Sequence, residues 1–139
     1  MIKSILVATD GSEHAKKALA LASDLGAKYN ARLVLVHVLL TNARAETLRT
    51  LATRRGLSKD QRDLLENYEI DFHREVAAAG AAVGFVTVPP PRELVKAIGR
   101  QIMDRAEKAA TKAGVKKVVM HTVEGDPAEA ILELAASSK

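Results

Sequence analysis

The sequence predicts an α/β fold built on an open parallel sheet, because short apolar runs alternate with segments of helical period. Residues 5–8 and 31–39 are rich in Val, Ile and Leu, and only Arg32 and His37 interrupt the second run. Such runs are typical of strands that are covered on both faces. A helix-patterned segment joins them, which makes a strand–helix–strand unit whose crossover we expect to be right-handed.

The first strand leads through a tight turn into a helix. Thr9-Asp10-Gly11-Ser12 breaks the apolar run, and Ser12 can cap the helix by accepting a hydrogen bond from a first-turn N–H. Ligands of open α/β sheets bind beyond the carboxyl ends of the strands, so we expect Asp10 at the lip of a binding crevice. The predicted apolar stripe of the helix comprises Ala15, Ala18, Leu19, Ala22, Leu25 and Tyr29.

The middle of the chain, residues 41–84, has a helical but irregular pattern. Leu48, Leu51 and Ala52 predict a short helix that ends at Gly56, and Ser58 is expected to cap a longer helix after it. The β-branched run 85–88 is followed by three prolines, which cannot donate to a sheet ladder, so an extended connector is predicted there. The apolar positions of the longer helix are Leu64, Leu65, Tyr68, Phe72 and Val76.

A helix, a third strand and a last helix follow. Gly114 is predicted to adopt the left-handed conformation that ends the first of these helices. Residues 116–123 are predicted to form the third strand. Asp126, Pro127 and Glu129 then form a complete helix start, in which Glu129 can reach back to the N–H of the Asp126 cap. The apolar face of the first helix comprises Leu94, Val95, Ile98, Ile102, Ala106, Ala109, Ala110 and Ala113.

Composition and charge exclude several classes of protein. With 139 residues, of which 47% are hydrophobic and 27% charged, the chain suits one soluble domain. The sequence has no cysteine, which excludes disulfides and thiolate catalysis. It has no apolar run of about 20 residues and no signal-peptide pattern, so we expect a cytoplasmic protein without membrane contact. The net charge is +4, but the basic residues are dispersed and aromatics are only 3%, so nucleic acid is not an expected partner.

The four histidines, His14, His37, His73 and His121, show no metal-ligand spacing. His37 and His121 alternate with apolar residues, which predicts interior or rim histidines whose hydrogen bonds are satisfied. Asp10, Ser12 and His37 do not follow the order of a hydrolytic triad, and the sequence lacks a G-x-S-x-G elbow. We therefore assign no catalytic residue and no metal ligand.

Three segments, in this order, resemble the universal stress protein family. Ile5-Leu6-Val7-Ala8-Thr9-Asp10-Gly11-Ser12 is similar to its first strand and T/V-D-x-S turn, and His37-Val38 is similar to the His-Val pair that commonly ends its second strand. Gly125-Asp126-Pro127-Ala128, with Ile131-Leu132, resembles its G-x-P/D-P-A-x-x-I-L segment. The resemblance implies a Rossmann-like sheet of the adenine nucleotide alpha hydrolase-like type, with the visible strands in the order 3-2-1.

The resemblance covers nearly all of this chain but only two-thirds to three-quarters of a family domain. In relatives a fourth strand leads to a glycine-rich loop, G-x-x-G with a later G-S/T, that holds the phosphates of ATP. We expect the chain to be a fragment of a longer product; the alternative is that another chain covers the apolar edge of residues 5–7. The 139 residues alone are expected to bind ATP weakly or not at all.

For the complete protein the resemblance implies an adenine nucleotide, namely ATP with Mg²⁺ as a candidate companion, conditional on that loop. Asp10 would contact the ribose or the phosphate–metal region, and its alternative role is to form the turn. The backbone of Val38 would read the adenine edge, whereas its side chain could simply belong to the core. Ala8 and Thr9 would line the same pocket, and Val123, by geometry alone, would close the adenine side.

Three functions remain open. The first is a stress-response protein that binds an adenine nucleotide as a homodimer without a defined turnover, and the second is a dimeric module without a nucleotide. The third, an ATP-pyrophosphatase-like enzyme, is disfavoured because Thr9-Asp10-Gly11-Ser12 lacks the paired glycines and leading serine of S-G-G-x-D-S. We expect a single domain over 1–139 with a helical insertion at about 42–84, which would be a covering layer or else a lid or partner surface.

Overall fold

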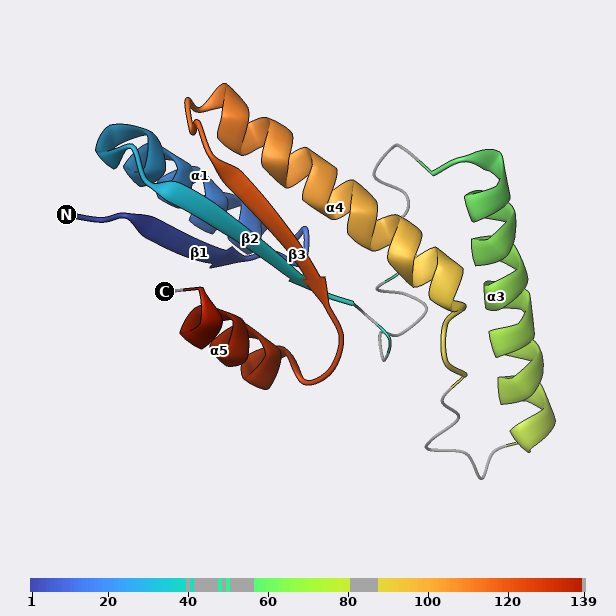
Figure 1. The fold of residues 1–139 in the computed structure, drawn as a ribbon. Coiled ribbons are helices and arrows are strands. Elements are labelled where there is room, and N and C mark those ends of the chain that lie inside the picture. The colour runs from blue at the N-terminus through green and yellow to red at the C-terminus, as the bar shows by residue number, and fades with distance from the viewer. Residues whose placement is uncertain (40, 42–47, 49, 51–56, 81–87, 139) are drawn as a thin grey trace. The chain divides into compact units, whose positions relative to one another are not determined.

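The computed structural model describes residues 1–39, 41, 48, 50, 57–80 and 88–138 (Figure 1). The predicted short helix that ends at Gly56 and the run 85–88 lie largely outside these residues. The chain divides into two compact units, 1–39 with 99–139 and 40–98. The strands are β1 (Ser4–Ala8), β2 (Arg32–Val38) and β3 (Val118–Val123). The helices are α1 (Glu13–Tyr29), α3 (Lys59–Ala79), α4 (Arg92–Lys112) and α5 (Pro127–Ser137).

The first unit contains a parallel sheet in the order β1-β2-β3, which confirms the predicted α/β fold and strand order. Ser4 pairs with Arg32, and Leu33 pairs with Val118. All three strands therefore start at one edge of the sheet, here called the amino edge, and end at the opposite, carboxyl edge. Among the strands that the structure describes, β1 is at the outer position of the sheet and β2 is paired on both of its sides.

Helices cover both faces of the central strand. α1 and residues 99–112 of α4 lie on one face of the sheet, and α5 lies on the other (Figure 1). Leu33 and Leu35 are fully buried toward α1 and α4, and Val34 and Val36 alternate toward the opposite face, where they are 2% and 0% exposed. The core between the sheet, α1 and α4 comprises Val7, Leu19, Ala22, Leu33, Leu35, Met103, Ala106, Ala110 and Val115.

Helix α1 has the predicted start, and its buried face matches the predicted stripe in part, since Leu19 and Ala22 are buried. The Ser12 hydroxyl accepts a hydrogen bond from the Ala15 N–H at 3.1 Å, which confirms the cap. The buried residues of α1 are Leu19, Ala22, Ser23 and Gly26, whereas Ala18 and Tyr29 of the predicted stripe are exposed. The apolar pattern missed Ser23, whose hydroxyl donates to the Leu19 carbonyl at 2.7 Å, so this polar side chain can be buried.

The other element ends follow local sequence signals. Gly114 has φ +96° after α4, as predicted, and β3 begins at Val118, two residues later than the sequence pattern suggested. Asp126 accepts a hydrogen bond from the Glu129 N–H at 3.1 Å, and Pro127 occupies the first turn of α5. In the second unit, Ser58 and Gln61 form a reciprocal capping box at the start of α3.

No helix in the described part of the chain is long and apolar enough to cross a bilayer.

We expect Asp126→Ala to lower the free energy of unfolding by about 1 kcal/mol, because it removes the acceptor for a first-turn N–H of α5. Urea unfolding followed by circular dichroism measures the loss. Asp126→Asn keeps an acceptor at the cap and serves as the control, with most of the stability retained. An equal loss in both variants would contradict a capping role.

Candidate functional site

The candidate site is the carboxyl edge of the sheet, where the predicted binding residues follow their strands. Val38 and Val123 are register partners on β2 and β3, and both are half-buried. The Leu39 N–H donates to the Val123 carbonyl at 2.8 Å, which continues the pairing past the end of β2. Ala8 is exposed and pairs with Val36, two residues before Val38. The three side chains share one face of the sheet, the α5 face.

The turn after β1 is fixed from several sides. The Thr9 N–H donates to the Val36 carbonyl at 2.8 Å, and the Thr9 hydroxyl accepts from the Gly11 N–H at 3.3 Å. The Thr9 side chain is buried and thus serves the turn itself. Gly11 has φ +79°, and a Cβ built there would lie 3.0 Å from Ile102 Cγ1. A side chain at this position would be strained and would also press on α4.

Asp10 places a carboxylate at the outer side of this turn. Its Oδ1 accepts a hydrogen bond from the Ser12 N–H at 2.9 Å, and the residue is exposed. Burial raises the pKa of Asp10. This effect is outweighed by hydrogen bonds from the Ser12 hydroxyl and from the backbone of residues 10 and 12, and by the electrostatic effect of the nearby His37, all of which lower the pKa. The pKa is therefore below its ordinary value of 3.8, so Asp10 is ionised at neutral pH.

His37 lies beneath this turn and is 1% exposed. Its Nδ1 lies 2.8 Å from the Thr9 carbonyl oxygen, and a carbonyl can only accept, so Nδ1 carries the proton and donates. Nε2 is buried and has no hydrogen-bond partner among the described residues. The prediction of a fully satisfied histidine is thus wrong for one of its two nitrogens.

Burial lowers the pKa of His37 below 6.5, and the hydrogen bond to Thr9 and the charge of Asp10 offset this only in part. A neutral ring tolerates an unpartnered Nε2 lone pair, whereas a protonated Nε2 would leave a buried charge. His37 is therefore neutral, and its hydrogen bond to the Thr9 carbonyl supports the turn that carries Asp10.

Gly99 of α4 permits this arrangement. A Cβ built at Gly99 would lie 3.0 Å from His37 Cδ2, 3.3 Å from His37 Nε2 and 3.2 Å from Leu39 Cδ2. The helix backbone thus rests directly on the imidazole ring and shields it from water. Sequence reasoning missed this contact, and the signal that could have found it is a lone glycine in the middle of a strongly helical apolar pattern.

The described residues contain no group of three or more His, Cys, Asp or Glu side chains that could hold a metal ion.

A hollow of about 720 Å³ lies at the amino edge, which is the end of the sheet away from Asp10. None of the predicted site residues lines it. Sequence reasoning missed this place, although Lys3, Arg32 and Lys117 each stand at or next to the start of a strand, and the starts of parallel strands meet at one edge.

Comparison with known proteins gives one family and several related structures. The family model described as "Universal stress protein family" matches residues 1–139. A crystal structure of a universal stress protein in complex with cAMP shares 18% identity, with a TM-score of 0.54, over 99% of this chain and 66% of its own. No curated protein matches the chain.

Two further structures have named sources. A protein from Mycobacterium tuberculosis H37Rv shares 18% identity, with a TM-score of 0.53, over 98% of this chain and 64% of its own. A universal stress protein family member from Burkholderia pseudomallei shares 28% identity, with a TM-score of 0.54, over 98% of this chain and 74% of its own. The chain thus spans about two-thirds to three-quarters of the length of the proteins it resembles.

We expect the free energy of unfolding to fall as the pH is lowered through 6.5. The pKa of His37 is lowered in the folded protein, so the unfolded chain takes up a proton at a pH where the folded protein does not. His37→Asn places an amide N–H near the position of Nδ1 but cannot titrate, and it should abolish this decline. Urea unfolding at several pH values measures it, and exposed His14→Asn is the control. A decline that persists in His37→Asn would exclude His37 as its source.

We expect Gly99→Ala to destabilise the fold by roughly 1–3 kcal/mol, the usual range for overpacking. The same change at an open helical position would stabilise by about 1 kcal/mol. The His37 ring cannot move aside without losing its bond to Thr9, so the new methyl group has no room. Thermal unfolding measures the sign, and a stabilised variant would show that the contact relaxes freely.

Proposed function

The chain belongs to the universal stress protein family, and on that premise we propose that it binds an adenine nucleotide at the carboxyl edge of its sheet. The observation that carries the proposal is Asp10, an ionised, exposed carboxylate on a turn whose backbone is held by hydrogen bonds to Thr9 and His37. Sites of this kind need a fixed polar group beside apolar walls.

The surrounding residues have roles that fit a nucleoside. A carboxylate accepts hydrogen bonds from ribose hydroxyls, and we assign Asp10 this contact or one in the phosphate–metal region. Val38 and Val123 lie side by side and offer an apolar wall for the adenine ring, with the Val38 backbone at its edge. Ala8 leaves space at the end of β1, and Thr9 acts through the turn.

The cAMP in one structural relative supports an adenine ligand as the chemical class. We propose ATP, with Mg²⁺ held mainly by its phosphates, as the ligand of the complete protein. The same proposal includes a role in the stress response, a homodimeric state and a cytoplasmic location. It also includes a single domain with an insertion at about 42–84.

The alternative is a dimeric stress-response module that binds no nucleotide. One observation favours it: the Thr9 hydroxyl already accepts a hydrogen bond from the Gly11 N–H within the turn. The two functions differ in one measurable property, which is the effect of the Asp10 charge on nucleotide affinity.

We expect Asp10→Asn to weaken ATP binding by tenfold or more, since a hydrogen bond to a charged group contributes about 1.5–3 kcal/mol. Asparagine can still accept from the Ser12 N–H, so the turn is kept. Isothermal titration calorimetry on the complete protein, with exposed Asp24→Asn as the charge-matched control, measures the change. Unchanged affinity in Asp10→Asn would reduce Asp10 to a turn former, and an absence of binding in every variant would favour the module without a nucleotide.

A further inference from the structure

We propose that the hollow at the amino edge is a second site, which binds the phosphoryl group of a small molecule. Eight residues line it: Lys3, Ser4, Asn30, Ala31, Arg32, Lys116, Lys117 and Ser138. Four of these carry a positive charge and none carries a negative one. The volume of about 720 Å³ lies within the range of ordinary small-molecule sites.

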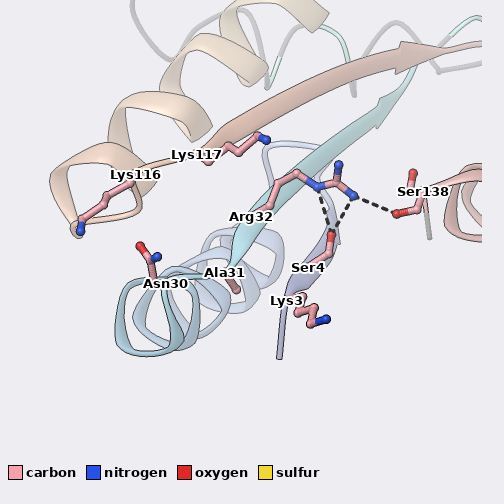
Figure 2. Close-up of a pocket in the computed structure, with 8 residues that line it drawn as sticks. All are labelled: Lys3, Ser4, Asn30, Ala31, Arg32, Lys116, Lys117 and Ser138. Carbon is pink, nitrogen blue, oxygen red and sulfur yellow. Dashed lines mark hydrogen bonds between the residues drawn. The ribbon is translucent and has the colours of Figure 1, made fainter. Parts of the chain in front are cut away.

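The register of the sheet places three of the lining residues in one row. Ser4 pairs with Arg32, and Lys117 directly precedes Val118, the partner of Leu33. The Leu33 N–H also donates to the Lys117 carbonyl at 2.9 Å. Ser4, Arg32 and Lys117 therefore lie side by side, and Figure 2 shows their side chains directed the same way, toward Ser138. Lys116 extends away from Arg32 in the same view.

Arg32 is the pre-oriented member of this row. Its Nη2 donates to the Ser138 carbonyl at 2.9 Å, and Nε and Nη2 both lie 3.4 Å from the Ser4 hydroxyl (Figure 2). Nη1, which carries two N–H donors, has no partner among the described residues. A guanidinium in this state suits an oxyanion, because little side-chain freedom is lost on binding.

A purely structural role explains part of this arrangement. Arg32 stabilises the carboxyl end of α5 through the Ser138 carbonyl, and Lys116 and Lys117 follow the carboxyl end of α4, where positive charge is favoured. That role does not explain why Arg32 and Lys117 lie level on adjacent strands, since like charges in this position repel each other. An anion between them would convert the repulsion into attraction.

The chemistry of the lining selects the kind of anion. A phosphoryl group can accept from Arg32 Nη1, the Lys117 ammonium and the Ser4 hydroxyl at the same time, because it has three oxygens. The lining contains no aromatic ring on which a base could stack, which disfavours single-stranded nucleic acid. The ligand is therefore free phosphate or a small phosphate monoester.

Titration of the ¹⁵N-labelled full chain with inorganic phosphate, at constant ionic strength, tests this site. We expect chemical-shift changes confined to residues 3–5, 31–33, 116–118 and 138. Lys117→Gln should weaken binding at least about fivefold, because it removes one charged donor. Lys17→Gln on α1 removes the same charge from an exposed position elsewhere and should have no comparable effect. Shift changes spread over all lysines, or equal losses in the two variants, would overturn the proposal.

Two further arms identify the source of the phosphoryl group and separate the two sites. If glycerol 3-phosphate binds more tightly than phosphate, the ligand is a monoester, and equal affinity indicates free phosphate. A single-stranded oligonucleotide that displaces phosphate at the same residues would overturn the choice of a small ligand. Asp10→Asn must leave phosphate binding here unchanged, so failure of the carboxyl-edge proposal would not affect this one.

Discussion

The structure depends on the burial of one strand, β2, from every direction. It pairs with β1 and β3, and α1, α4 and α5 cover its two faces. Residues 33–36 are at most 2% exposed, so nearly every apolar side chain in them contributes its full transfer free energy to folding. A shift of this strand by one residue would move all its buried apolar side chains to the opposite face of the sheet. The register is therefore strongly specified, and the residues at the two edges of the sheet are fixed with it.

The two polar interruptions of β2 lie at its ends, and each organises one edge. At the amino edge, Arg32 joins the start of β1 to the end of α5 through Ser4 and Ser138. At the carboxyl edge, His37 joins β2 to the turn after β1 through the Thr9 carbonyl. A rigid apolar segment separates them, so each polar residue is held in place by the same core. The chemistry of the sheet is thus concentrated where its central strand stops being apolar.

The sequence predicted those features that depend on neighbours along the chain. The Ser12 and Asp126 caps and the left-handed Gly114 follow from short patterns, and the structure confirms them. The strand order depends on contacts between distant segments; the resemblance to universal stress proteins implied it, and the structure confirms it as well. The unpartnered Nε2 of His37 could not be predicted, because it depends on the approach of Gly99 from a helix more than sixty positions later in the chain. The basic row at the amino edge could not be predicted without the register of the sheet, since Arg32 and Lys117 are far apart in sequence and become neighbours only in the folded sheet.

The position of β1 on the outside of the sheet has a consequence for its backbone. The Thr9 N–H points to β2, and amides alternate in direction along a strand, so those of Leu6 and Ala8 point away from it. Protons on the inner amides exchange with solvent only when the sheet opens, whereas the outer ones exchange rapidly unless another strand is present. Deuterium uptake at every second amide along β1 would therefore indicate that no strand pairs with its outer side. Protection of all its amides would indicate a neighbouring strand, either from this polypeptide or from a second copy.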